Sequence, residues 1–322
     1  MAARSKSRVC IVTPGTRDAN NGNWRTASRW AALLRGSYRV ILQTEWRGEP
    51  TDLLIALHAK RSAASIAAFR EYRGAAPIAL VLTGTDLYRD LPAKSRDATA
   101  SLEAADRIVA LQADAPRLLK AAWRGKTEVI YQSAPALTPA KKAPSPLRAV
   151  AVGHLRDEKD PRTIFAALRK LPAGVPLEFT HIGASLDAPL GVEARALEKA
   201  DPRYHYAGPL PHGLARAAIK RAHVLVHPSI MEGGANVIVE AITAGTPVLA
   251  SRMSGNVGML GEDYPGYFDV RDASGLRDRL VQLAEDRRSL VALERAARAR
   301  RPLFHPAAEA RAVRRLVAGL LA

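Results

Sequence analysis

Short apolar runs, separated by loops and amphipathic segments, recur along the whole chain. The first run is Arg8–Thr13, followed by Pro14-Gly15, a polar loop and an amphipathic segment over 24–35. An unbroken apolar run is typical of a strand buried on both faces, and the segment after it has helical periodicity. Strand, glycine-containing loop and helix in this order predict the opening of a doubly wound α/β domain.

The same pattern continues through both halves of the chain. It predicts strands at 38–43, 53–57, 78–82, 107–111, 127–131, 147–152, 177–182, 204–207, 224–226, 247–250 and 267–270. It predicts helices over 62–72, 113–122, 214–221 and 307–321, and others that begin at Pro161 and Asn236. Residues 133–146 carry four prolines in fourteen positions and read as an interdomain linker. We therefore expect one α/β domain over 1–140 and a second over 147–303.

The stretch from His227 to Ser251 combines a strand, a glycine turn, a helix and a second strand. Asn236 is a good helix N-cap, and the backbone N–H groups of a first helical turn, with the helix dipole, form an anion site. Glu232 and Glu240 flank this site, and carboxylates accept hydrogen bonds from hydroxyl groups. A nucleoside diphosphate sugar offers both groups. The alternative is that Glu240 lies on the solvated face of an amphipathic helix.

The composition places the chain among ordinary globular proteins. Its 322 residues suffice for two domains, with 48% apolar and 25% charged residues. The one cysteine, Cys10, lies in an apolar run, which favours a buried strand residue and excludes a disulfide framework. Without a membrane-length apolar run or the apolar core of a signal peptide, the expected location is cytoplasmic.

The formal net charge of +17 raises the possibility of nucleic-acid binding. Residues 1–146 hold 23 Lys and Arg against 12 Asp and Glu, and residues 147–322 hold 25 against 19. The excess is spread out, aromatic residues are only 5%, and no basic run with interleaved aromatics offers a stacking platform. We expect no nucleic-acid partner; the basic first half instead suits small anionic substrates.

Polar clusters follow several predicted strands of the first half, where parallel sheets bind ligands. His58, Lys60 and Arg61 follow the strand over 53–57, and Thr83-Gly84-Thr85-Asp86 follows the strand over 78–82. We expect an acceptor to bind near these clusters, with His58 acting either chemically or structurally. The loop Asn20-Asn21-Gly22-Asn23 either approaches a ligand or is an ordinary connection.

The core E-G-G-x-N-V-x-x-E-A-x-x-x-G-x-P-V, which starts at Glu232, resembles the donor-sugar motif of the family-4 retaining glycosyltransferases of GT-B fold. This resemblance implies two Rossmann-like doubly wound domains facing a cleft. It also implies that the C-terminal helix, about 307–322, crosses back to the first domain. Val313, Leu316, Val317 and Leu320 would pack there.

The resemblance also implies roles for individual residues. Arg156 and Lys159 resemble the pair that clamps the donor diphosphate, Glu240 would hold the ribose, and Glu232 would hold the sugar ring. The implied donor-binding residues are Arg156, Lys159, Leu210, Gly233, Gly234, Ala235, Asn236, Val237 and Glu240. The implied catalytic residues are His58, Thr83 and Glu232, and the expected acceptor-binding residues are Gly22, Asn23, Arg25, Lys60, Arg61 and Gly84. The chain has no Asp-x-Asp sequence, so we expect no metal and no cofactor.

The segments LTGTDLYRD, ALHAKRSA and TPGTRDANNGNWRTA resemble one subgroup, the selenosugar synthases of selenoneine biosynthesis. This implies transfer from a UDP-sugar to selenophosphate, a small anionic nucleophile that needs cationic positioning more than a general base. In the wider family a histidine commonly stands at the position of Thr83. The alternatives are an O-glycosyltransferase with a small, lipid or sugar acceptor, a nucleotide-sugar epimerase or hydrolase, and a non-catalytic donor-binding scaffold. We expect a monomer or homodimer.

Overall fold

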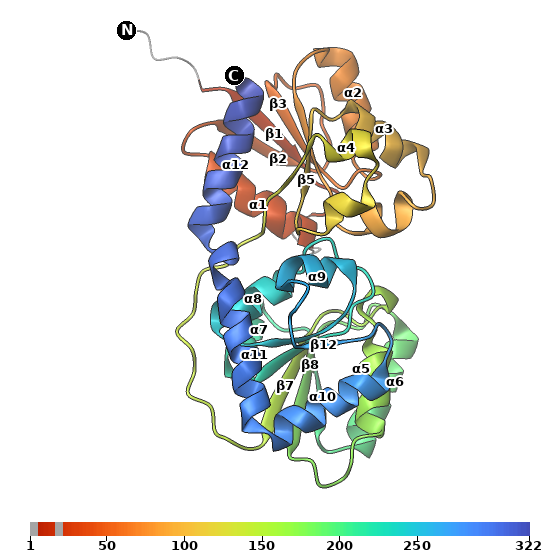
Figure 1. Cartoon of the computed structure of the whole chain (residues 1–322). Helices are drawn as coiled ribbons and strands as arrows, with labels where there is room; N and C mark the ends of the chain where they lie inside the picture. Colours follow the sequence, from red (N-terminus) through yellow and green to blue (C-terminus); the bar gives the residue numbers. More distant parts are fainter. Residues whose placement is uncertain (1–5, 17–21) are drawn as a thin grey trace. The chain divides into compact units, whose positions relative to one another are not determined.

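The computed structural model describes residues 6–16 and 22–322, which divide into two compact units (Figure 1). The first unit comprises Met1–Gln132, Glu232–Ala235 and Pro306–Ala322, and the second comprises Ser133–Met231 and Asn236–His305. Each unit contains one parallel six-stranded sheet with helices. The prediction of two doubly wound parallel-sheet folds is therefore confirmed.

The first sheet has the strand order β2-β1-β3-β4-β5-β6. Its strands are β1 (Arg8–Val12), β2 (Arg39–Gln43), β3 (Leu53–Leu57), β4 (Ile78–Val81), β5 (Arg107–Ala110) and β6 (Thr127–Val129). The helices of this unit are α1 (Gly22–Leu34), α2 (Ala63–Arg73), α3 (Arg96–Ala104), α4 (Ala121–Arg124) and α12 (Pro306–Leu321), with a π-helix η1 (Asp86–Asp90) and a 3-10 helix η2 (Ala115–Leu118). Because β1 lies between β2 and β3, the winding of the chain reverses at this strand.

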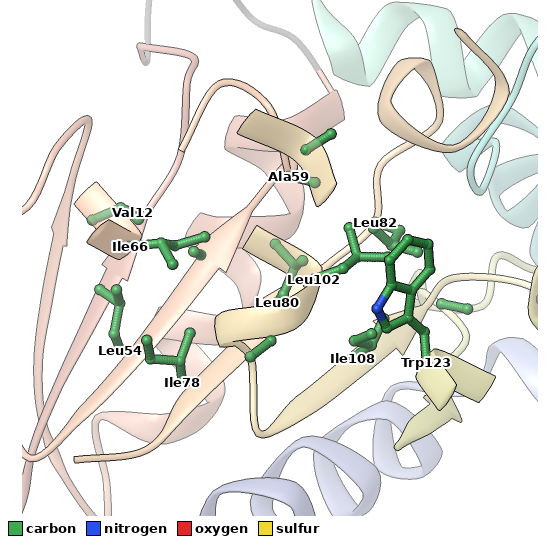
Figure 2. Close-up of a cluster of buried hydrophobic side chains, with 14 of the residues drawn as sticks. Val12, Leu54, Ala59, Ile66, Ile78, Leu80, Leu82, Leu102, Ile108 and Trp123 are labelled. Carbon is green, nitrogen blue, oxygen red and sulfur yellow. The ribbon is translucent and has the colours of Figure 1, made fainter. Parts of the chain in front are cut away.

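Alternate residues of these strands face opposite sides of the sheet, and both sides are covered. In β1, Val9 and Ile11 belong to a cluster with α1 and α12, whereas Cys10 and Val12 belong to a cluster with α2, α3 and α4. Figure 2 shows the latter cluster, in which Trp123 lies beside Leu82, Leu102 and Ile108. Burial on both faces explains why the strands are apolar throughout rather than alternating.

The C-terminal helix α12 packs on α1 within the first unit. Val313, Leu316 and Val317 are buried in the same cluster as residues of β1, β3 and α1, and Leu320 packs against it. Glu309, buried near the start of the helix, accepts hydrogen bonds from Arg29 Nε at 2.8 Å and Trp30 Nε1 at 2.9 Å. An apolar stripe and one buried ion pair therefore hold the last helix.

The second sheet has the strand order β12-β11-β10-β7-β8-β9. Its strands are β7 (Leu147–Val152), β8 (Leu177–Ile182), β9 (Tyr204–Gly208), β10 (Val224–His227), β11 (Val248–Ser251) and β12 (Tyr267–Phe268). The helices of this unit are α5 (Pro161–Arg169), α6 (Ala188–Ala200), α7 (His212–Arg221), α8 (Asn236–Ala244), α9 (Ser254–Leu260), α10 (Ala273–Glu285) and α11 (Arg287–Arg300), with 3-10 helices η3 (Asp157–Lys159) and η4 (Arg301–Phe304). Here the winding reverses between β7 and β10.

Two groups of helices cover the second sheet. Helix α5 contacts α6 and α10, and α8 contacts α7 and α11. Helix α8 is apolar almost throughout and is buried from Ile238 to Ala244. Among the described residues, no helix is long and apolar enough to cross a membrane.

The prediction of a helix over 113–122 is wrong. The segment forms the short 3-10 helix η2, then an extended residue, Leu119, and then the one-turn helix α4. Leu119 is buried in the core cluster, and its backbone angles, φ −93° and ψ 150°, interrupt the helix. The Arg124 guanidinium donates to the carbonyl oxygens of Pro116 and Leu119, which supplies hydrogen bonds that a continuous helix would have made.

Candidate functional site

Segments that leave β7 and β10, where the winding reverses, carry most of the predicted donor-binding residues of the second unit. In doubly wound sheets, ligands bind beyond the carboxyl ends of the strands where the winding reverses. The segment 153–160 follows β7, and the segment that follows β10 begins at Pro228. Ile230 N donates to Glu158 O at 3.0 Å, so the two segments are joined directly.

The segment after β7 carries Arg156 and Lys159. Arg156 is exposed and extended, with its Nε 3.8 Å from a Glu158 carboxylate oxygen, and Lys159 ends the 3-10 turn η3. The Lys159 side chain lies over Gly153, where an added Cβ would meet its Cδ at 3.6 Å. The structure thus brings the two cations together on one short turn.

Helix α5 begins directly after this turn, as the Asp160-Pro161 pair predicts. Asp160 adopts a left-handed conformation, φ 46°, and accepts a hydrogen bond from Thr163 Oγ1 at 2.5 Å. Burial raises the pKa of the Asp160 carboxyl, and its hydrogen bonds to Thr163 oppose this effect. The helix start is therefore fixed by local hydrogen bonding as well as by the proline.

Gly183, at the end of β8, supports the first residues of the same segment. Its φ is +157°, and an added Cβ would lie 2.9 Å from His154 N and overlap the Gly153 carbonyl oxygen. His154 Nδ1 in turn accepts a hydrogen bond from Ala184 N at 3.0 Å. The chain leaving β7 is therefore seated on a position that only glycine can occupy without displacing it.

The glycine turn Glu232–Ala235 packs with the first unit. An added Cβ on Gly233 would lie 2.5 Å from Gly84 N, and one on Gly234 would lie 2.6 Å from Leu111 Cβ. The Gln132 amide donates to Gly234 O at 2.9 Å. Gly233 is therefore required by the close approach of the backbone at Thr83 and Gly84, and Gly234 by that of the Leu111 side chain. Gln132, which the sequence pattern did not single out, holds the turn.

Helix α8 begins at Asn236, one residue after the turn. Asn236 and Val237 are partly buried, and Glu240 lies four residues after Asn236 on the same helical stripe. The exposed fraction of Glu240 is only 8%, so the interpretation of this residue as part of a solvated helix face is wrong. Glu232, by contrast, is partly exposed at the start of the turn.

Glu240 receives a hydrogen bond from a residue that the motif did not contain. His212 Nε2 lies 2.7 Å from Glu240 Oε1. Leu210, two residues before His212, is partly exposed in the connection between β9 and α7. The preceding Gly208 has φ +69°, a conformation that favours glycine, and turns the chain at the end of β9.

In the first unit, His58 directly follows β3 and is 1% exposed. Its Nε2 lies 2.8 Å from Thr85 Oγ1, and its Nδ1 accepts a hydrogen bond from Arg61 N at 3.3 Å. Burial lowers the pKa of His58, partly offset by the neighbouring Asp86 carboxylate. His58 thus joins two strand-end loops as a buried group, and its catalytic role stays a prediction.

Lys60 and Arg61 are exposed beside His58. Lys60 Nζ lies 4.0 Å from Asp90 Oδ1, and Arg89 Nε lies 3.3 Å from the same oxygen. Two cations from different loops therefore flank one buried carboxylate, which leaves a local excess of positive charge at the surface. Arg89, in the π-helix η1, was not predicted.

Asp86 organises the loops after β3 and β4, a role that its place in the Thr83–Asp86 cluster did not indicate. Its carboxylate is fully buried and accepts backbone hydrogen bonds from Ala59, Thr83, Gly84 and Leu87. These bonds fix the backbone at the predicted Thr83 and Gly84. The sequence signal was only that an aspartate follows Thr83 three positions later, as in many loop motifs.

The remaining predicted residues lie at the start of α1. Gly22 is the first residue of this helix, Asn23 and Arg25 are partly buried in its first turn, and the Gly22 carbonyl oxygen accepts a hydrogen bond from Thr26 Oγ1. The predicted loop residues Asn20 and Asn21 lie outside the described residues. Within residues 6–16 and 22–322 there is no group of three or more His, Cys, Asp or Glu side chains suited to a metal ion.

Comparison with known structures defines the class of protein. The fold is similar to that of sucrose-phosphate synthase from Thermosynechococcus elongatus, with a TM-score of 0.79 and 16% identity over 98% of this chain and 99% of that one. The Anabaena protein HepE, solved with UDP and glucose, gives a TM-score of 0.75 and 13% identity over 98% and 100%. The lipopolysaccharide outer core galactosyltransferase WaaB gives 0.73 and 13% over 97% and 99%. The two doubly wound sheets are thus those of the GT-B glycosyltransferases.

The family follows from the sequence of the second unit. The family described as glycosyl transferases group 1 matches residues 139–300, just over half of the chain. The chain therefore belongs to the glycosyl transferases group 1. No curated protein matches it in a sequence search.

Proposed function

We propose that this glycosyltransferase transfers a sugar from a UDP-sugar to selenophosphate and forms a C–Se bond. One observation supports the proposed donor binding: the segments that follow β7 and β10 contact each other at the reversal point of the second sheet. One brings Arg156 and Lys159, and the other leads into α8 with Glu240. HepE of Anabaena, which has the same fold, was solved with UDP-glucose.

The donor half would act by electrostatic stabilisation. Arg156, Lys159 and the N-terminus of α8 would stabilise the negative charge that grows on the departing diphosphate. Glu240 would accept hydrogen bonds from the ribose hydroxyls, and the main chain at Leu210 would face the base. Glu232 would hold the sugar as its anomeric carbon becomes oxocarbenium-like. Protein cations would supply the charge that a metal ion supplies elsewhere, so we propose a reaction without metal.

The acceptor half is basic, and neither His58 nor Thr83 is an exposed general base. His58 is buried and hydrogen-bonded, and Thr83, where other family members commonly carry histidine, has a hydroxyl that is a poor base. Exposed Lys60 and Arg61, with Arg25, would bind a small anion. An acceptor that is already a nucleophile fits this set better than a neutral hydroxyl.

The proposed step balances without a base. A selenium lone pair of selenophosphate forms the bond to the anomeric carbon. The bond from that carbon to the diphosphate oxygen breaks, and its electron pair leaves with UDP. The selenium carries negative charge, so no proton has to be removed before attack.

The test is mass spectrometry of reactions with UDP-glucose or UDP-GlcNAc, with and without selenophosphate, each repeated with EDTA. We expect UDP and a selenium-containing sugar phosphate only when selenophosphate is present, and equally in EDTA. Release of UDP without selenophosphate would instead indicate a hydrolase, and transfer to an added sugar would indicate an O-glycosyltransferase. Loss of activity in EDTA would refute the metal-independent reaction.

Variants of the donor half test the roles of the two cations. Replacing Arg156 or Lys159 by alanine should lower kcat by about 10²–10³-fold, the typical loss of one transition-state charge donor. Arg169→Ala provides a matched control, because Arg169 is an exposed arginine at the far end of α5. An equal loss in all three variants would contradict the assigned roles.

A further inference from the structure

Glu240 stands in an unusual environment for a carboxylate. Helix α8 has the sequence NVIVEAITA, in which Glu240 is the single ionisable residue, and every residue from Ile238 to Ala244 is buried. Burying an ionised group is unfavourable unless hydrogen bonds compensate for the lost water. A side chain at this position therefore needs a defined partner.

His212 supplies such a partner from the neighbouring helix. Its Nε2 lies 2.7 Å from Glu240 Oε1, and the exposed fractions of the two side chains are 47% and 10%. An ionised carboxylate only accepts hydrogen bonds, so His212 Nε2 carries the hydrogen and donates it. The bond thus runs from a half-exposed ring into a buried carboxylate.

The backbone around His212 limits where this ring can lie. His212 is the first residue of α7, which packs against α8. The connection from β9 reads Gly208-Pro209-Leu210-Pro211, and its two prolines fix their φ angles. The His212 imidazole therefore follows a stiff connection, so little conformational entropy is lost when it hydrogen-bonds to Glu240.

We propose that His212 is a positioning residue, which orients the Glu240 carboxylate toward the ribose hydroxyls of the bound nucleotide. Holding Oε1 fixes the plane of the carboxylate, so its remaining acceptor directions are set before the ligand arrives. This inference rests on the proposed donor function, and it adds a residue that lies outside the glutamate motif. The acceptor plays no part in it.

The test compares two ligands on two variants by calorimetry. UDP carries both ribose hydroxyls, and 2′,3′-dideoxy-UDP carries neither. His212→Leu removes the donor and should weaken UDP binding about tenfold, with no change for dideoxy-UDP. His212→Gln keeps an N–H donor at similar reach and should restore most of the affinity. If the leucine variant does not fold, His212→Asn, whose amide is too short to reach Glu240, replaces it.

A matched control comes from a second histidine–glutamate pair in the same unit. His205 Nδ1 lies 2.8 Å from Glu198 Oε1 at the surface, so His205→Leu removes a contact of the same kind and length. It should leave the affinity for both ligands unchanged. In Glu240→Leu, which removes the acceptor of this hydrogen bond, the further change His212→Leu should cause little additional loss of UDP affinity, because the two side chains act as one unit.

The outcomes separate this inference from the function on which it rests. If His212→Leu weakens the binding of both ligands equally, or the binding of neither, the positioning role alone is overturned. If the unmodified protein binds UDP and dideoxy-UDP equally, the ribose role of Glu240 falls, and the role of His212 falls with it. A loss of affinity for UDP but not for dideoxy-UDP supports both the positioning role of His212 and the ribose role of Glu240.

Discussion

Removal of the Glu309 carboxylate should destabilise the first unit selectively. The side chain of Glu309 is fully buried and accepts hydrogen bonds from Arg29 Nε, at 3.0 Å and 2.8 Å, and from Trp30 Nε1 at 2.9 Å. In Glu309→Ala the Trp30 indole N–H and Arg29 Nε lose their acceptor, whereas Arg29 keeps its hydrogen bond to Gln132 Oε1 at 3.0 Å. The Glu309 contact joins the buried start of α12 to α1, and Arg314 Nε adds a second polar link by donating to Leu33 O at 3.2 Å.

The magnitude follows from the exposure of the partners. Breaking a buried ion pair by removing one member costs about 3–5 kcal/mol. The Arg29 side chain is 23% exposed and can regain some hydration, so we expect the lower end, about 3 kcal/mol. Glu309→Gln retains an acceptor for Trp30 and should cost about 1–2 kcal/mol.

The assay uses the distribution of tryptophan in the chain. All four tryptophans, Trp24, Trp30, Trp46 and Trp123, belong to the first unit, so their fluorescence during urea denaturation reports on that unit. Arg315→Ala, an exposed change on the same helix, should alter the free energy of unfolding by less than about 0.5 kcal/mol. If Glu309→Ala destabilises the fluorescence transition no more than this control, the ion pair does not hold α12.

Three further predictions concern the loops that carry the candidate site. Asp86→Asn replaces an acceptor of several backbone N–H groups by a side chain with one acceptor oxygen, so the first unit should lose about 2–3 kcal/mol in the same fluorescence assay; an unchanged midpoint would contradict the role of Asp86. Gly183→Ala should lower both thermal stability and UDP affinity in calorimetry, because its Cβ overlaps the backbone at Gly153. Gly213→Ala, with open space around its Cβ, should lower neither. Burial lowers the pKa of His181 to about 4 from an ordinary 6.5. Because the unfolded chain takes up a proton at a higher pH than the folded protein, the free energy of unfolding has its full value above pH 6.5 and falls by on the order of 3 kcal/mol as the pH drops toward 4. The melting temperature of His181→Gln, followed by circular dichroism, should depend less on pH in this range.

Part of the structure was readable from single stretches of sequence. The strands β3, β7 and β8 occupy the predicted ranges residue for residue. A strand covered on both faces has to be apolar at successive positions, and this requirement leaves a local signal. The glycine turn after β10 and the start of α8 at Asn236 were likewise local, since turn and capping residues act within a few positions.

Residues that look alike in sequence were given different surroundings by the fold. His58 and Lys60 are two positions apart, yet the histidine is buried between two loops and the lysine is exposed. The helix predicted over 113–122 was interrupted because Leu119 entered the core. Helical periodicity describes a segment by itself, whereas burial depends on what packs against it.

The sequence by itself determined the order of the strands, the two-domain α/β class and the glycine turn between two glutamates. Only the tertiary structure decided the partners of the polar groups. Glu309 meets Arg29, 280 positions away, and Glu240 meets His212 on the adjacent helix. Apolar burial follows from local pattern, but a hydrogen bond needs two specific atoms within about 3 Å, and that is set by how the strands and helices are brought together.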